Sequence, residues 1–230
     1  MGAEFYGEDF QGADVAPFVG INTFLHLPWV KNHKELLEAK PDVAIIGEPF
    51  DFGTTIRPGA RYGPRAIRAA STIPSPPFER FNIETGADPF GTFRTVDYGD
   101  VVVSPGDVIG SHKSMTLKVK EVLEADGIPV MLGGDHSITY ANVRAFQKKF
   151  KNIGMIHFDT HADCAPQGLT GFKYDHGAHI RRIMEMGCLK GKNYSLVGPR
   201  GYWPGRDLYK WMSDQDFQWF TMLDVEELGI

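Results

Sequence analysis

The sequence predicts an α/β protein built on a parallel sheet. Short apolar runs alternate with longer segments of helical composition along most of the chain. The unit VMLGGDHSITYANVRAFQKKFKNIGMIHFDTHAD has the length of a strand–helix–strand crossover, and such connections join parallel strands. No internal repeat or low-complexity linker breaks the pattern, so we expect residues 1–230 to form a single domain.

The predicted strands are short runs rich in β-branched and aromatic residues, which favour buried strands of a parallel sheet. In chain order they are Val43–Ile46, Thr95–Tyr98, Pro129–Leu132, Ile153–Phe158, Tyr194–Val197 and Trp219–Met222.

The predicted helices start or stop at characteristic residues. Pro64 suits the first turn of a helix, and Gly127 and Gly187 suit the position just past a helix end. The helices are expected at residues 64–71, 112–126, 137–150, 177–186 and 206–213, with an irregular stretch at 72–93. Asp224 looks like the N-cap of one more helix, which would have only about one turn before Ile230; we therefore expect the natural chain to continue.

Composition excludes several classes of protein. The net charge of −5 and pI near 5.9 disfavour nucleic-acid binding and anionic membranes. The acidic N-terminus lacks a signal-peptide core, and the run APFVGINTFLHLPWV is too short and too polar to span a bilayer. With two cysteines no disulfide framework is indicated, and we expect a cytoplasmic protein without nucleic-acid or membrane partners.

A candidate metal site follows two of the predicted strands. Asp159, His161 and Asp163 come directly after the strand 153–158, and in an extended segment these alternate residues would share one face. Burying ionised carboxylates costs several kcal/mol unless a partner offsets it. The crossover brings His136, after the preceding strand, to the same edge of the sheet. Carboxylates with neutral imidazoles suit Mn, Zn, Fe or Ni.

Other polar residues near these motifs have more than one interpretation. Asp135 can cap the following helix or support the metal ligands from behind, and we favour support. Cys164 has no recognisable base beside it and is interpreted as a small buried thiol. Asp175 and Arg181 can be site residues or ordinary charged residues on the solvated surface. Trp203 and Trp211 are interpreted as packing residues, not as residues that bind substrate.

The segments GGDHSITY and HFDTHADC resemble the first two signature motifs of the ureohydrolase family, which includes arginase and agmatinase. Further similarity lies in FDFGTTIRPGARYGPRAIRAAS, TVDYGDV, FKYDHGAHIRR and LVGPRGYWP, and it points to the agmatinase-like branch. The resemblance implies a three-layer α/β/α arginase-like fold with a central parallel sheet. It also implies a homo-oligomer, a trimer or hexamer, that hydrolyses a guanidino compound.

The resemblance implies a binuclear Mn²⁺ centre, with Ni²⁺ or another divalent ion as alternatives. His136 and Asp163 would bind one ion, His161 the other, and Asp159 both. His176 matches the family's proton-shuttle histidine, although it is equally a loop residue before the 177–186 helix.

The family's third motif, Ser-x-Asp-x-Asp-x-x-Asp-Pro, is not recognisable here, so four of six expected ligands are present. The implied products are urea and an amine, from agmatine, guanidinobutyrate, guanidinopropionate or guanidine. The missing motif favours one alternative, a catalytically silent homologue that serves as an oligomer subunit. A metal-dependent deacetylase of the same general fold is a third interpretation, against which the GGDHS and HG-x-x-x-RR segments count.

Overall fold

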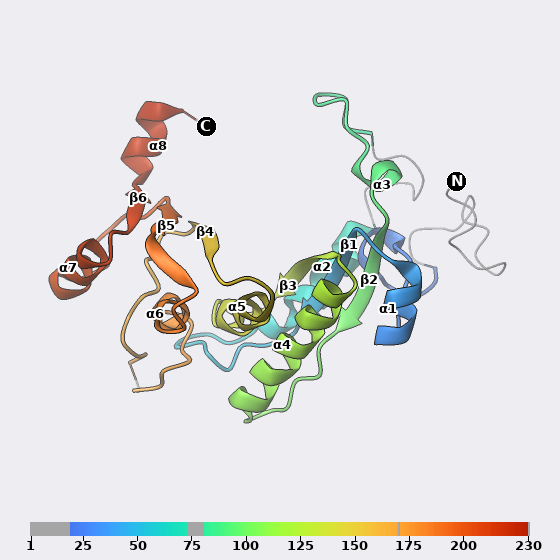
Figure 1. Ribbon diagram of the computed structural model, residues 1–230, viewed down its shortest axis with the longest axis horizontal. Helices are drawn as coiled ribbons and strands as arrows, with labels where there is room; N and C mark the ends of the chain where they lie inside the picture. Colours follow the sequence, from blue (N-terminus) through green and yellow to red (C-terminus); the bar gives the residue numbers. More distant parts are fainter. Residues whose placement is uncertain (1–18, 73–80, 170, 230) are drawn as a thin grey trace. The chain divides into compact units, whose positions relative to one another are not determined.

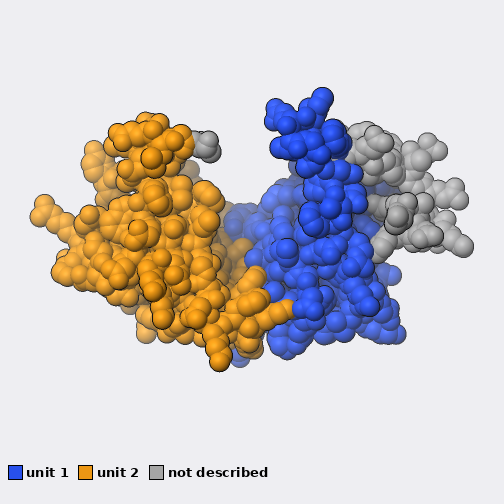
Figure 2. Space-filling view, turned by 45° about the horizontal axis from the view of Figure 1, so that its top comes forward, with its two compact units in different colours: residues 1–51, 59–134 blue, residues 52–58, 135–230 orange. Residues whose placement is uncertain are grey.

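The computed structural model describes residues 19–72, 81–169 and 171–229, which fall into two compact units (Figures 1 and 2). Unit 1 comprises residues 1–51 and 59–134, and unit 2 comprises residues 52–58 and 135–230. Each unit holds one 3-stranded parallel sheet with helices packed on it. The predicted fold class is confirmed, and the single domain stays a prediction.

The sheet of unit 1 has the order β2-β1-β3. Its strands are β1 (Val43–Glu48), β2 (Thr95–Asp100) and β3 (Ile128–Gly133). In the parallel register Val43 lies opposite Thr95 on one side and Ile128 on the other. Every residue of β1 after Val43 is buried, which indicates that both faces of this central strand are covered.

Two helices cover the sheet of unit 1, and each begins for a local reason. Helix α2 (Gly63–Ser71) carries Pro64 in its first turn, as predicted. Helix α4 (Val108–Glu124) begins four residues before the predicted start, because Asp107 accepts a hydrogen bond from the Gly110 amide and caps it. Unit 1 also contains elements that the sequence pattern did not predict: η1 (Phe24–His26), α1 (His33–Ala39), η2 (Ala60–Tyr62) and α3 (Pro89–Thr92).

A buried ion pair joins α2 to β2. Arg68 donates from Nε and Nη2 to the two carboxylate oxygens of Asp97, at 2.7 and 2.9 Å, and it also contacts Asp100. Arg68 and Asp97 are both almost fully buried. Removing either partner alone would leave an uncompensated charge in the interior, so this pair fixes the position of α2.

The sheet of unit 2 has the order β4-β5-β6, all parallel. Its strands are β4 (Ile153–Phe158), β5 (Leu189–Val197) and β6 (Gln218–Phe220). Strand β5 begins five residues before the predicted start at Tyr194. The predicted crossover therefore needs a correction: β3 and β4 belong to two different sheets, so the sheet-edge rule by itself does not place His136 beside the residues after β4.

The helices of unit 2 are α5 (Ile138–Lys149), α6 (His179–Glu185), α7 (Arg206–Asp214) and α8 (Met222–Leu228). The prediction that Asp224 caps the last helix is wrong. Thr221 is the N-cap, and Asp224 is the N3 residue whose carboxylate accepts from the Thr221 amide at 2.6 Å. Among the described residues, no helix combines the length and apolar character that crossing a membrane requires.

The core of unit 2 lies between its sheet and its helices. Tyr194 and Leu196 of β5 are fully buried against Ile180 and Ile183 of α6. Alternate positions of β5 thus face the helix, and this packing fixes the start of α6 beside the end of β4. Candidate functional residues lie at that position.

Candidate metal centre

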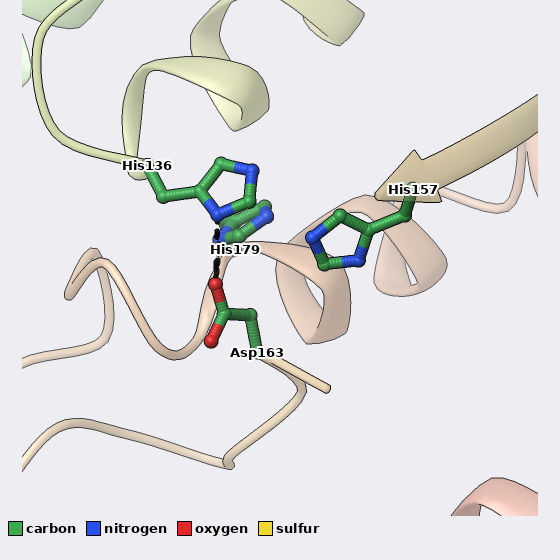
Figure 3. A group of neighbouring side chains, drawn as sticks. All are labelled: His136, His157, Asp163 and His179. Carbon is green, nitrogen blue, oxygen red and sulfur yellow. Dashed lines mark ion pairs between the residues drawn. The ribbon is translucent and has the colours of Figure 1, made fainter. Parts of the chain in front are cut away.

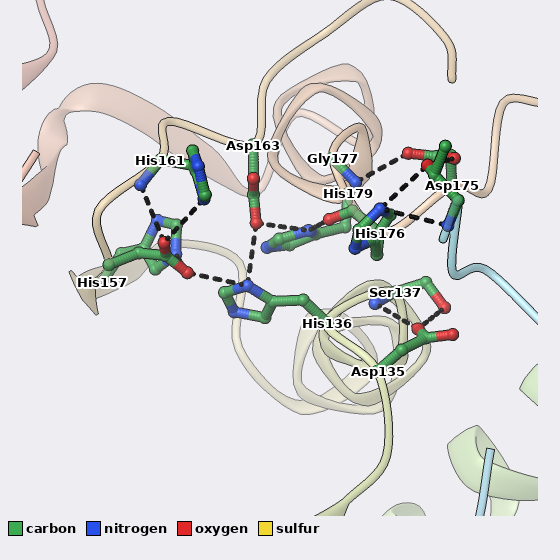
Figure 4. A network of polar contacts seen from close by, with 12 residues as sticks. Asp135, His136, Ser137, His157, His161, Asp163, Asp175, His176, Gly177 and His179 are labelled. Carbon is green, nitrogen blue, oxygen red and sulfur yellow. Dashed lines mark hydrogen bonds and ion pairs between the residues drawn. The ribbon is translucent and has the colours of Figure 1, made fainter. Parts of the chain in front are cut away.

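Three predicted ligands from two separate segments meet in unit 2. His136 lies in the turn before α5, and its Nδ1 is 2.8 Å from Asp163 Oδ2 and 3.2 Å from Asp159 Oδ2 (Figure 4). The imidazole is 33% exposed and the two carboxylates are more buried. Two carboxylates this close to one imidazole need a cation that both of them contact. That cation is either the protonated imidazole ring or a bound metal ion.

His161 lies at the rim of this group. Its side chain is 56% exposed, and its Nδ1 is 3.6 Å from Asp159 Oδ1. The segment after β4 is not extended as predicted, because the His161 amide donates to Asp159 Oδ1 at 2.8 Å and Asp163 takes a positive φ of 47°. The turn directs Asp159 and Asp163 to His136 while His161 faces solvent.

Two further histidines, which the sequence pattern did not single out, complete the group (Figure 3). One possible ligand atom from each of His136, His157, Asp163 and His179 lies within 4.8 Å of every other. The spacing in the sequence could have identified His157. It lies on β4, two positions before Asp159, and alternate positions of a strand share a face. His179 opens α6, and no signal in the sequence shows where that helix packs.

A hydrogen bond at Nδ1 fixes the ring of each of these two histidines. His157 Nδ1 is 2.6 Å from the hydroxyl of Tyr194, and His179 Nδ1 donates to the His176 carbonyl at 2.8 Å. His157 Nε2 faces Asp159 Oδ2 at 3.5 Å. All three imidazoles pack together, with the His136 ring 4.1 Å from that of His179 and 4.9 Å from that of His157.

Asp135 connects the loop 52–58 to the start of α5. Its Oδ2 accepts from the Gly53 amide at 2.8 Å, and its Oδ1 accepts from the amide and hydroxyl of Ser137 at 2.8 and 2.5 Å. Gly53 is required here, because a Cβ at this position would lie 2.7 Å from Ser137 Oγ. Asp135 thus holds the backbone around His136, and its role as a support of metal ligands stays a prediction.

His176 lies in the loop before α6, and residues 52–58 hold it. Its amide donates to the Gly53 carbonyl at 3.0 Å, and its Nε2 lies 3.0 Å from Thr55 Oγ1. Asp175 accepts from the Gly177 amide at 2.8 Å and from the Thr55 hydroxyl at 3.3 Å, so it orders this loop instead of lying free on the surface. The His176 carbonyl in turn binds His179, which links this loop to the histidine group.

Electrostatic effects in the group act in opposite directions. Burial alone would lower the pKa of His136, but the hydrogen bond to Asp163 and the nearby carboxylates raise it. Burial lowers the pKa of His157, and it lowers the pKa of His179 well below its usual value. Burial would raise the pKa of Asp159, yet the His161 amide and the surrounding imidazoles lower it. The pKa shifts of Asp159, His157 and His179 favour an ionised carboxylate and neutral imidazoles, the states that metal ions bind, whereas the shift of His136 favours the protonated ring.

Cys164 and Arg181 have structural roles. Cys164 is fully buried, as predicted, and burial raises the pKa of its thiol to about 12. Arg181 donates from Nε to the Cys164 carbonyl at 3.0 Å, and its guanidinium lies 3.5 Å from the centre of the Trp211 ring. A cation over an aromatic face is a packing interaction, so Trp211 packs as predicted and Arg181 is not a free surface charge.

An α/β fold with grouped His and Asp side chains at strand and helix ends defines a class of candidate metal-dependent proteins. Imidazole nitrogens and carboxylate oxygens are the donors that Mn, Fe, Ni and Zn accept, so the residues present fit a divalent ion. Residues 41–230 match the model of the arginase family. The chain belongs to the arginase family.

Curated relatives and a solved structure show the same kinship. The chain is 37% identical over 204 residues to "Agmatinase, mitochondrial" of Gallus gallus, covering 89% of this chain and 57% of that protein. It is 34% identical over 207 residues to "Guanidinobutyrase" of Pseudomonas aeruginosa, covering 90% and 63%. The proclavaminate amidino hydrolase structure from Streptomyces clavuligerus superposes with a TM-score of 0.80 at 29% identity, covering 94% of this chain and 68% of that one. The chain thus spans about three fifths of the curated relatives' length.

Proposed function

We propose that the protein containing this chain is a metal-dependent hydrolase that cleaves a C–N bond of a guanidino compound and releases urea and an amine. The observation that carries the proposal is the convergence of His136, Asp159 and Asp163 in a chain of the arginase family: His136 Nδ1 lies 3.2 Å from Asp159 Oδ2 and 2.8 Å from Asp163 Oδ2. The names of its relatives, an agmatinase and a guanidinobutyrase among them, support the substrate class.

The described side chains suit a centre of two divalent ions, with Mn²⁺ as the proposed metal. We assign His136 and Asp163 to one ion, His161 to the second and Asp159 to both. His161 is the most exposed of the four, so its turn after β4 would have to close on an ion. When bound, two ions supply a water-derived nucleophile at neutral pH, which a resonance-stabilised guanidinium requires.

His176 is the proposed proton donor to the departing amine. Its ring lies beside Thr55, whose amide and hydroxyl approach Nε2 at 3.4 and 3.0 Å and hold the imidazole in place. An imidazole held in place by a hydroxyl can serve as a general acid. Asp175, which accepts from the same Thr55 hydroxyl, fixes that hydroxyl in turn.

The test is an assay of urea release by the full-length protein that contains these residues. Purified metal-free protein is loaded with Mn²⁺ and incubated with agmatine, guanidinobutyrate, guanidinopropionate and guanidine. Urea from one of them, absent without metal and absent in the Asp163→Ala variant, supports the proposal. Full metal occupancy without urea from any of them would favour a catalytically silent oligomer subunit instead.

A further inference from the structure

We propose that His157 is a positioning residue for Asp159, with Tyr194 behind it. The Tyr194 hydroxyl donates to Nδ1 of His157, and Nε2–H of His157 donates to Oδ2 of Asp159. The proposal rests on the proposed function, because the carboxylate held in this way is the one assigned to both ions. His157 and Tyr194 then hold a metal ligand without being ligands themselves.

The three side chains lie on one face of the sheet of unit 2. In the parallel register Tyr194 lies opposite Met155, two positions before the residue opposite His157. The amide of Asp159 donates to the Val197 carbonyl at 3.0 Å, which extends the ladder one residue beyond β4. His157 and Asp159 are therefore alternate positions of the same ladder and share a face. Figure 3 shows the His157 ring reaching the candidate site from the end of β4.

Tyr194 is a fixed donor. Its side chain is fully buried, and its ring packs against that of Phe217 with 4.5 Å between the ring centres. Its hydroxyl oxygen lies 2.6 Å from Nδ1 of His157. Burial raises the pKa of the Tyr194 phenol, so the hydroxyl keeps its hydrogen and can donate it to a ring nitrogen that carries a lone pair.

The contact with Asp159 decides which nitrogen of His157 carries the hydrogen. Nε2 is buried, makes no hydrogen bond of normal geometry to the described residues, and faces Asp159 Oδ2 at 3.5 Å. An ionised carboxylate only accepts, so a hydrogen on Nε2 makes this contact attractive, whereas a bare Nε2 would set its lone pair against the carboxylate. The neutral ring then has its lone pair on Nδ1, where the Tyr194 hydroxyl donates. Hydrogen bonds in active sites are often long in the free protein and shorten in the complex.

The other contacts of Asp159 leave a place for this donor. Oδ1 accepts from the His161 amide at 2.8 Å, and Oδ2 lies 3.2 Å from Nδ1 of His136. His136 is a proposed metal ligand, and a ring nitrogen that binds an ion has no hydrogen to donate. His157 is then the imidazole that can still donate to Oδ2. Loss of a hydrogen bond that orients a metal ligand typically weakens metal binding by about 10–100-fold.

The first experiment measures the tautomer of His157 in the metal-free, full-length protein. Isotope labelling of the histidine ring nitrogens and their NMR correlation with the carbon-bound ring hydrogens distinguish a hydrogen on Nε2 from one on Nδ1. The signal that disappears in His157→Gln belongs to His157. We expect its hydrogen on Nε2 at pH 8. A hydrogen on Nδ1, alone or together with one on Nε2, would overturn the proposal.

The second experiment separates the two ring nitrogens by substitution and measures the Mn²⁺ affinity of the full-length protein. His157→Gln keeps an N–H donor near the position of Nε2, whereas His157→Asn keeps a polar group only near that of Nδ1. We expect His157→Gln within about threefold of the wild type, His157→Asn weaker by about 10–100-fold, and Tyr194→Phe weaker by about tenfold. Tyr209→Phe, at an exposed ring, is the matched control and should bind as the wild type does.

Rescue by Gln but not by Asn supports the proposal, because a ring that only fills space would leave the two amides equivalent. Equal losses in both variants, or tighter binding by His157→Asn, would overturn it. Circular dichroism shows whether each variant folds, and the wild-type tautomer decides if they do not. A wild type that binds no Mn²⁺ or releases no urea would count against the proposed function, whereas the tautomer would still decide the role of His157.

Discussion

The amide of Gly53 donates a 2.8 Å hydrogen bond to Asp135 Oδ2. This contact joins loop 52–58 to the residue that precedes His136. The same loop carries Thr55, which contacts His176, so one buried carboxylate connects the proposed metal ligand His136 to the proposed proton donor His176.

Replacing Asp135 should therefore loosen the loop as well as destabilise the fold. We expect Asp135→Ala to lower the free energy of unfolding by about 2–4 kcal/mol, because each buried donor left without an acceptor costs about 1–3 kcal/mol. Hydrogen exchange at the Gly53 amide should accelerate in native conditions. The matched control is Asp107→Ala, which removes a helix N-cap in unit 1. Its free energy of unfolding should fall while hydrogen exchange at the Gly53 amide stays slow. Equal exchange rates at Gly53 in both variants would contradict the role of Asp135 in holding the loop.

Asp159→Ala should abolish urea release by the full-length protein and reduce its metal content from two ions toward one. The carboxylate of Asp159 lies between His136 and His161, so its loss removes a ligand from both proposed positions. Elemental analysis after dialysis measures the metal content. Asp214→Ala, at an exposed carboxylate paired with Lys210, is the control, and undiminished occupancy in Asp159→Ala would refute the bridging role.

His176→Ala should lower kcat of the full-length protein by about 10²–10⁴-fold and leave its metal content nearly intact. The pH dependence of kcat should also change, because the variant lacks the proposed proton donor. His33→Ala, in unit 1, serves as the control for a histidine outside the site. Loss of metal in His176→Ala would show a ligand or structural role instead.

Neither cysteine should react with iodoacetamide at pH 8 while the chain is folded. Both thiols are buried, and burial raises the pKa of Cys164 to about 12 and raises that of Cys188. At pH 8 only about one Cys164 thiol in 10⁴ is then ionised, and the thiolate is the reactive form. Intact mass after alkylation should show no adduct in buffer and two in urea. An adduct on folded Cys164 would mean that this part of the core opens.

Asp51 should contribute stability that is lost in acid. A hydrogen bond from Arg61 is the main reason that the pKa of Asp51 lies below its usual range, and the Gly59 amide adds to it. A lowered pKa means that the contribution is complete above the unfolded-state value of about 3.9 and disappears as the pH falls through the folded-state value. Urea titrations at several pH values should give a larger free energy of unfolding for the wild type than for Asp51→Asn at pH 7. This difference should disappear below about pH 4. A gap independent of pH would contradict this account.

Local signals determined much of this protein from the sequence alone. Alternating strands and helices predicted the α/β class, and Pro64 predicted a helix start that the structure has. The contact of His136 with Asp159 and Asp163 was also expected, although the reason given for it is wrong, because β3 and β4 lie in different sheets. The fold class and the helix start depend on neighbours in the chain, which is why a single sequence contains them.

Tertiary packing decided the rest. His179 joins the metal group only because Ile180 and Ile183 bury α6 against β5, and Tyr194 supports His157 from a strand 37 residues away. The separation of β3 and β4 into two sheets depends on strand pairing that a crossover pattern does not specify. Helix α8 could begin after Thr221 or after Asp224, because either residue can act as the N-cap. The reciprocal hydrogen bonds of the capping box in the folded chain show that Thr221 is the N-cap. Contacts between distant segments carry no period or spacing in the sequence, so only the folded chain shows them.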